Sequence, residues 1–199
     1  FRPDRITPWP SIYGFMNVPA GSGPFPVVIM LHGYIEKRKY ETLAYSVRYA
    51  DDLAWQGYIV IHPNLRGYPP SDDGPNPFEV GRAVDVLNLI ALVKNQAGHP
   101  GALWQAEPGA IALWGHSTGG GIALRVLTVN PAVRAAVLLA PMSGDEAQNA
   151  YRTYWTFSGE TRWQFEITVP ESELAPISPA NFYARITAAV SLHHGEQDS

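Results

Sequence analysis

The sequence contains no cysteine, which excludes disulfide bonds, thiolate metal sites and a cysteine nucleophile. It also has no excess of positive charge, because 14 lysines and arginines stand against 18 aspartates and glutamates, for a formal net charge of −4. Nucleic acid and anionic membrane surfaces are therefore not expected as partners. No apolar run approaches the ~20 residues of a membrane-spanning helix, and no signal peptide is recognisable. We expect a soluble protein, and the sequence does not distinguish a secreted from a cytoplasmic one.

Length and composition predict one globular domain spanning residues 1–199. Hydrophobic side chains make up 46% of the sequence and charged ones 16%, which is enough to bury a sizeable core. Apolar runs typical of strands alternate with segments of helical spacing. The predicted strands are residues 11–18, 27–31, 58–62, 110–114, 135–139 and 188–192, and the predicted helices are residues 40–56, 78–97 and a third ending at Asn130. This alternation indicates an α/β fold with a mostly parallel sheet and helices on both faces.

The most informative stretch is Gly115-His116-Ser117-Thr118-Gly119, which lies between a predicted strand and a predicted helix. Strand, sharp turn and helix form the context of the G-x-S-x-G nucleophile elbow. The residues two before and two after the serine must be small, and both are glycine. Such a turn exposes the Ser117 hydroxyl beside helix amides that lack intrahelical acceptors, where negative charge develops during acyl transfer. A phosphate-binding P-loop is excluded because its Gly-Lys-Ser/Thr ending is absent.

Three more polar clusters follow predicted strands. They are His32-Gly33-Tyr34, Asn64-Leu65-Arg66-Gly67-Tyr68 and His194-Gly195-Glu196-Gln197-Asp198. Ligands of parallel sheets bind beyond the carboxyl ends of the strands, so these clusters and Ser117 are expected at one edge.

In these clusters the chain resembles the α/β-hydrolase superfamily over nearly its whole length. The closer resemblance is to its branch of prolyl-oligopeptidase-type (S9) catalytic domains and dienelactone-hydrolase-like esterases. The resemblance implies a three-layer sandwich in which Ser117 is the nucleophile and Asp198 the acid of a catalytic triad. It assigns the oxyanion hole to the backbone N–H groups of Tyr34 and Thr118. Asp145 is the alternative acid, because related folds sometimes place the acid after the preceding strand, although a helix N-cap role fits it equally.

The triad histidine is not found among the six histidines of the sequence. The resemblance places it some tens of residues beyond the acid, on the loop after one more strand. His193 and His194 lie too close to Asp198 to bridge it to Ser117, and we interpret His194 as a residue that orders its loop. We therefore expect the fold to lack its C-terminal strand and helix here, with the histidine on a second polypeptide segment or cut away together with them.

A metal site formed by residues 193–198 is a weaker alternative. Consecutive strand residues point to opposite faces, and the spacing matches no zinc motif. No metal and no cofactor are predicted.

Residues 142–181 interrupt the alternation of strands and helices, at the place where this superfamily inserts a cap. The segment contains many aromatic side chains, which either line a substrate pocket or pack the cap onto the body. They are Tyr151, Tyr154, Trp155, Phe157, Trp163 and Phe165. Candidate substrate contacts are Arg66, His116 and Trp155, although Arg66 could equally brace its loop.

The sequence thus predicts a serine esterase that acts on a small-molecule carboxylic ester through an acyl-enzyme on Ser117. An S9-type serine peptidase is the first alternative, and no preceding β-propeller is present in the sequence. The second alternative is a non-catalytic binding protein on a hydrolase scaffold, which the missing histidine favours and the intact elbow opposes.

Overall fold

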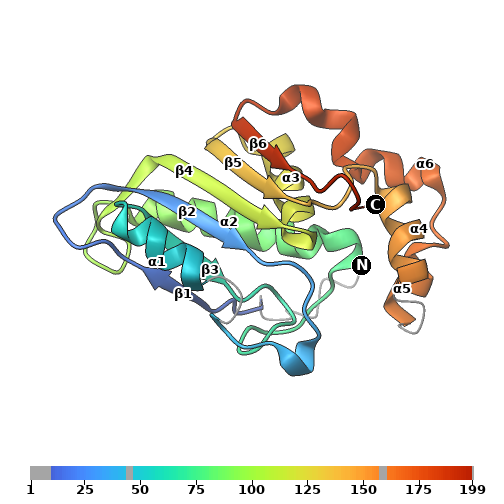
Figure 1. Cartoon of the computed structure of the whole chain (residues 1–199), viewed down its shortest axis with the longest axis horizontal. Coiled ribbons are helices and arrows are strands. Elements are labelled where there is room, and N and C mark those ends of the chain that lie inside the picture. The colour runs from blue at the N-terminus through green and yellow to red at the C-terminus, as the bar shows by residue number, and fades with distance from the viewer. Residues whose placement is uncertain (1–9, 44–46, 157–160, 199) are drawn as a thin grey trace, which may run out of the picture.

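A six-stranded sheet forms the middle layer of the fold (Figure 1). The computed structural model describes residues 10–43, 47–156 and 161–198. The strand order is β1-β3-β2-β4-β5-β6, in which β1 runs antiparallel to β3 and all other neighbours are parallel. The strands are β1 (Gly14–Asn17), β2 (Phe25–Leu31), β3 (Ile59–Pro63), β4 (Ala106–His116), β5 (Val133–Leu139) and β6 (Ala189–His193). The predicted mostly parallel α/β sheet is confirmed.

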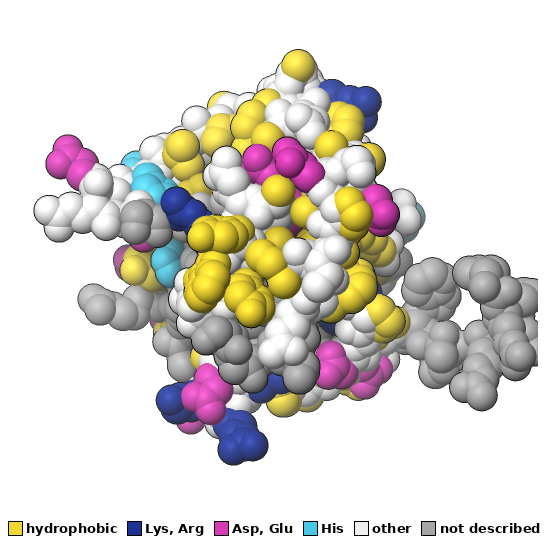
Figure 2. All heavy atoms as spheres, turned by 90° about the vertical axis from the view of Figure 1, so that its right-hand side faces the viewer, with side chains coloured by type: hydrophobic (Ala, Val, Ile, Leu, Met, Phe, Trp, Pro, Cys, Tyr) yellow, Lys and Arg dark blue, Asp and Glu magenta, His cyan; other side chains and the backbone are white. Residues whose placement is uncertain are grey.

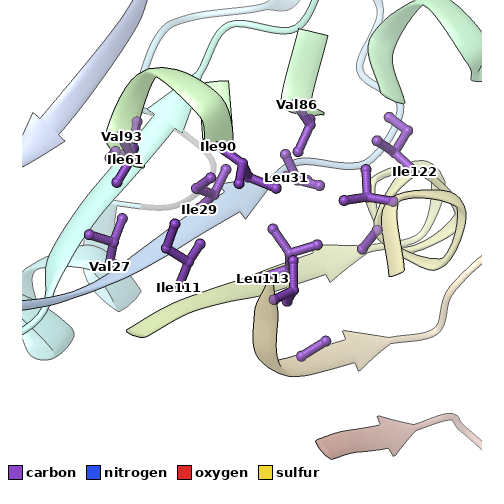
Figure 3. Packing of buried hydrophobic residues seen from close by; sticks show 14 of the residues in the cluster. Val27, Ile29, Leu31, Ile61, Val86, Ile90, Val93, Ile111, Leu113 and Ile122 are labelled. Atoms are coloured by element: carbon purple, nitrogen blue, oxygen red, sulfur yellow. The ribbon is translucent and has the colours of Figure 1, made fainter. Parts of the chain in front are cut away.

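Helices α2 (Val80–Gln96) and α3 (Thr118–Val129) cover one face of this sheet. Figure 3 shows the core between these helices and the sheet, in which Ile29 and Leu113 of the central strands lie with Ile90 of α2. All three side chains are at most 1% exposed. Central strands that are buried on both faces need continuous apolar runs, which is why the sequence of β2 contains no polar residue.

The opposite face of the sheet is covered only in part. Helix α1 (Val47–Trp55) packs Ala50 against Val28 and Met30 of β2. The register of the parallel strands continues this face from Met30 to Trp114, then to Val137 and Ser191. Trp114 and Val137 are half-buried and Ser191 is exposed. The β4–β5–β6 part of this face therefore presents apolar side chains to solvent.

Two of the predicted helices begin later than expected. Leu43 has a φ of 85°, which a right-handed helix cannot contain, so the predicted start at residue 40 is wrong. A short 3₁₀ turn, η1 (Lys37–Lys39), precedes this point, and residues 44–46 lie outside the described part. Phe78 and Glu79 also have positive φ values, of 51° and 60°, within η2 (Pro77–Glu79), and α2 therefore begins only at Val80.

Between β5 and β6 the chain forms a mainly helical segment beyond the carboxyl ends of the strands (Figure 1). It contains α4 (Glu146–Thr156), α5 (Thr161–Glu166), α6 (Glu171–Leu174), η3 (Ala175–Ile177) and η4 (Pro179–Arg185). The predicted cap-like insertion, about residues 142–181, falls on this segment, which we call the cap segment.

A half-buried arginine of α3, Arg125, ties the cap segment to the body. Nη2 of Arg125 donates to Oε1 of Glu146 at 2.5 Å and to the carbonyl oxygen of Phe78 at 2.9 Å. Its Nη1 donates to the carbonyl oxygen of Ile177. From α5, the carboxylate of Glu166 accepts the backbone N–H of Phe78 at 2.9 Å. These bonds hold the cap segment against α3 and η2.

Candidate active site

Ser117 occupies a strained turn between β4 and α3. Its φ of 52° and ψ of −118° are rare for a residue with a side chain. The turn is held by its own backbone: the N–H of Ser117 donates to Leu139 of β5 at 3.0 Å, and its carbonyl oxygen accepts from Gly121 and Met142 at 3.1 Å. Strain of this kind persists only where the surroundings over-determine it, and it is concentrated at functional sites.

The glycines on either side of the turn are required by close backbone packing. A Cβ atom on Gly119 would overlap the carbonyl oxygen of Leu31 and lie 2.6 Å from that of His32. A Cβ atom on Gly115 would lie 2.6 Å from the carbonyl oxygen of Gly119. Helix α3 can therefore start directly against the end of β2 only because both positions lack side chains.

The turn opens into a cavity of about 230 Å³, the Ser117 cavity. Four residues predicted for catalysis line it together: Ser117, Asp198, Tyr34 and Thr118. The remaining lining residues come from the end of β5, from α4 and from the end of β6: Ala140, Pro141, Met142, Ser143, Asn149, Arg152, Thr153, Thr156 and His194. The structure thus brings residues separated by more than 160 positions into one site at the predicted sheet edge.

The two predicted oxyanion donors belong to segments that meet at the serine. A Cβ atom added to Gly33 would lie 3.2 Å from the Cβ of Ser117, so the loop after β2 packs directly on the turn. Tyr34 follows in that loop and lines the cavity. Thr118 is the first residue of α3, where an amide has no acceptor within its own helix. Both residues therefore line the cavity next to Ser117.

Asp198 lies on a short loop after β6 that His194 organises. Nε2 of His194 donates to the backbone oxygen of Asp198 at 2.9 Å and lies 3.9 Å from its carboxylate. The N–H of Asp198 donates to Gly195 at 3.1 Å, which closes the turn. These bonds show His194 in the loop-ordering role inferred from the sequence.

His116 does not line the Ser117 cavity, although it was a candidate substrate contact. Its ring packs on the loop after β2, where Nδ1 would lie 3.0 Å from a Cβ atom on Gly33. Burial lowers the pKa of His116, and the negative charge of Asp198 opposes this shift. The neutral ring is therefore favoured, in a position beside the cavity rather than within it.

Arg66 likewise lies away from the cavity. Its guanidinium makes a bidentate ion pair with Asp85 of α2, at 2.8 Å from Nε to Oδ2 and 2.6 Å from Nη2 to Oδ1. Nη1 donates to the carbonyl oxygen of Pro75 at 2.8 Å, and only 9% of the residue is exposed. The structure thus gives Arg66 the loop-bracing role that the sequence left open.

The aromatic residues of α4 face away from the Ser117 cavity. Trp155 is 63% exposed and Tyr151 60% exposed, and the two rings pack on each other with centroids 6.1 Å apart. Trp155 is not among the residues that line the cavity. Phe165 is also exposed, whereas Phe157 and the side chain of Trp163 lie outside the described residues. Hydrophobic side chains gather on this face of the molecule, beside histidine and basic ones (Figure 2).

The cavity-facing side of α4 was missed by the sequence analysis. Asn149, Arg152, Thr153 and Thr156 all line the cavity. Their spacing of three, four and seven residues is that of one helix face. This signal was present in the sequence, but the aromatic residues between them were more conspicuous.

Asp145, the alternative acid, caps helix α4. Its Oδ1 accepts the N–H of Ala147 at 2.9 Å, which is the N-cap arrangement. It does not belong to the lining of the Ser117 cavity. Asp198 is therefore the carboxylate that the structure places at the site.

Two buried histidines lie near the sheet edge in structural positions. Burial lowers the pKa of His32 and of His62 to about 4, so both rings are neutral at pH 7. Nδ1–H of His32 donates to the carbonyl oxygen of Gly33 at 2.8 Å, which shapes the loop that leads to Tyr34. Within the described ranges, no three histidine or acidic side chains are grouped closely enough to hold a metal ion.

Residues 28–196 match the alpha/beta hydrolase family, and the chain belongs to this family. The resemblance to the α/β-hydrolase superfamily inferred from the sequence is thereby confirmed. No curated protein matched the sequence.

Many solved structures share the fold. Over 93% of this chain it is similar to the acylaminoacyl peptidase of Pyrococcus horikoshii, with a TM-score of 0.68, 18% identity and 31% of that chain covered. A puromycin-hydrolysing peptidase of Mycobacterium tuberculosis gives a TM-score of 0.67 and 20% identity, over 92% of this chain and 28% of that one. Est1E of Butyrivibrio proteoclasticus, solved with ferulic acid, gives a TM-score of 0.60 and 13% identity, over 94% of this chain and 86% of that one. The chain spans about half the length of several other similar structures.

In the part of the chain that the structure describes, no helix combines the length and apolarity needed to cross a membrane.

Proposed function

We propose that this protein is a serine hydrolase that cleaves carboxylic esters through an acyl-enzyme on Ser117. The observation that carries the proposal is the shared cavity, which is lined by Ser117 on its strained turn together with Asp198, Tyr34 and Thr118. Ser117 Oγ attacks the ester carbonyl carbon while a histidine accepts its proton. The carbonyl oxygen becomes an oxyanion, which the two N–H groups stabilise. The proton then passes to the departing alcohol, and water hydrolyses the acyl-enzyme by the same steps.

We further propose that a second polypeptide segment supplies this histidine. The support is a surface that fits such a segment: β6 is the last strand of the sheet, and all five of its residues are exposed. Beside it, the half-buried Trp114 and Val137 lie on the partly covered face. A further strand paired with β6 and a helix on this face would bury these side chains. A loop after that strand would emerge at the edge where Ser117 and Asp198 lie.

A peptidase of the same mechanism is the second candidate. Peptidases and esterases both occur among the solved structures that share this fold, and their likeness to this chain extends to the fold alone. Attack on an ester or an amide uses the same groups, and the difference lies in protonating a poorer leaving group. Short-chain p-nitrophenyl esters compared with aminoacyl-p-nitroanilides separate the two activities. The esterase proposal predicts hydrolysis of the esters alone.

The experiment that tests the proposal is covalent labelling with a fluorophosphonate probe, using the natural full-length protein. Ser143 lines the same cavity as Ser117 and provides the matched control. Labelling is expected in the wild type and in Ser143→Ala, with the adduct mapped to Ser117 by peptide mass spectrometry, and none in Ser117→Ala. If Ser117→Ala labels as well as the wild type, or if no serine in the wild type reacts, Ser117 is not an activated nucleophile.

A further inference from the structure

Helix α4 presents a polar side to the Ser117 cavity, and Arg152 is its only positively charged residue there. Asn149, Thr153 and Thr156 complete this side. Two of these groups are engaged within the helix region: Asn149 Nδ2 donates to the carbonyl oxygen of Ser143 at 2.8 Å, and the Thr153 hydroxyl donates to the carbonyl oxygen of Asn149. The side chains of Asn149 and Thr153 are therefore already bonded to backbone oxygens.

Arg152 differs in this respect from three arginines that hold the fold together. Arg66, Arg82 and Arg125 are each paired with a carboxylate, from Asp85, Glu79 and Glu146 respectively. Among the described residues, no carboxylate lies within ion-pairing distance of Arg152. The acid in the same cavity, Asp198, lies on the loop after β6.

A guanidinium that faces a cavity without a counter-ion favours a carboxylate partner on the molecule that enters. Arginine is suited to this task because its planar fork matches both carboxylate oxygens. Filling the cavity also removes water from the arginine, which strengthens its attraction for an anion. Arg152 is an exposed residue, so a neutral acyl chain would leave its guanidinium in contact with water and would offer it no such partner.

We propose that Arg152 makes the Ser117 cavity selective for esters that carry a free carboxylate, such as half-esters of short dicarboxylic acids. This inference rests on the proposed hydrolase function and names its substrate class. The volume of about 230 Å³ favours short substrates, because ligand pockets typically begin at about 300 Å³. The ester carbonyl lies at Ser117 while the distal carboxylate pairs with Arg152.

The test is a binding experiment that does not require turnover. Full-length protein carrying Ser117→Ala is titrated with monomethyl glutarate and with dimethyl glutarate, by calorimetry or by NMR shifts. The two compounds share the acyl chain and differ in one negative charge. The expected result is at least about tenfold tighter binding of the monoester, which is the scale of one charge-assisted hydrogen bond.

Variants at two arginines assign this preference to a residue. Arg152→Gln in the same background is expected to reduce the affinity ratio of the two esters to about one, and Arg152→Lys to restore part of it. Arg134→Gln is the control, because the Arg134 guanidinium binds the carbonyl oxygen of Gly109 on the surface and is not part of the cavity lining. This control is expected to keep the full ratio.

The outcomes separate the two proposals. Equal binding of both esters, no binding of either, or an unchanged ratio in Arg152→Gln overturns the inference about Arg152. If the probe labels Ser117 but the monoester is not preferred, the proposed substrate class is wrong and the proposed hydrolase function stands. A charge preference that depends on Arg152 in a protein that no probe labels supports the carboxylate site and contradicts the catalytic proposal.

Discussion

Replacing Gly119 by alanine tests whether the turn at Ser117 depends on backbone contact. The added Cβ would overlap the carbonyl oxygen of Leu31 and lie 2.6 Å from that of His32. Both oxygens belong to backbone at the end of β2, so no side-chain rotation relieves the overlap. Either α3 moves away from the sheet or the end of β2 is displaced, and both movements disturb Ser117 and the loop that carries Tyr34.

The expected cost is at least about 3 kcal/mol, since overpacking of well-packed cores costs about 1–3 kcal/mol and here the obstacle is rigid. The opposing gain from helix propensity is at most about 1 kcal/mol. For a chain of this size the loss corresponds to a fall in Tm of roughly 6–12 °C.

Gly121→Ala is the matched control because it makes the same substitution in the same helix. Its Cβ would meet the Cβ of Met142 at 3.1 Å, a contact that a shift of Met142 by a few tenths of an ångström relieves. Its free energy of unfolding is expected to stay within about 1 kcal/mol of the wild type. Urea unfolding followed by circular dichroism measures both variants. If Gly119→Ala is as stable as Gly121→Ala, the close packing of α3 on β2 is not what fixes the turn.

Three further predictions concern the acid, the buried histidines and the cap segment. Asp198→Asn is expected to lower kcat/KM for an ester about 10⁴-fold with little change in Tm, whereas Asp145→Asn, which alters only a helix cap, retains activity. His32 and His62 have pKa values of about 4 when folded, below the usual 6.5, so the unfolded chain binds more protons between these values. Stability should therefore fall as the pH drops from 6.5 to 4, by up to about 1.4 kcal/mol per pH unit for each histidine, and His62→Gln should reduce this slope in urea titrations. Burial raises the pKa of Glu146 to about 7, which offsets part of this pH dependence. Arg125→Ala leaves the Glu146 carboxyl buried without its partner. This variant should lose about 3 kcal/mol of stability, and its cap segment should become sensitive to limited proteolysis.

The sheet and the serine turn could be predicted because their sequence patterns are local. The continuous apolar run of β2 is needed because this strand is buried on both faces. The two glycines around Ser117 are needed because a Cβ atom at either position would overlap backbone. The placement of Asp198 followed from the rule that parallel strands end at the same edge.

The start of α2 and the side of α4 that faces Ser117 could not be placed in the same way. Phe78 has a positive φ because Glu166 and Arg125 bind its backbone N–H and oxygen, and both partners are distant in sequence. Arg152 lies in sequence among aromatic residues, and only tertiary packing decides which of these side chains are exposed. Where long-range contacts determine conformation, local propensity gives no signal.

The structure of the phosphonylated full-length protein tests the central claim most directly. A phosphonate on Ser117 Oγ imitates the tetrahedral intermediate and shows where its charged oxygen lies. The account predicts that oxygen within about 2.7–3.1 Å of the N–H groups of both Tyr34 and Thr118, with a histidine between the adduct and Asp198. A phosphonyl oxygen directed to solvent, or an adduct on another serine, would contradict it.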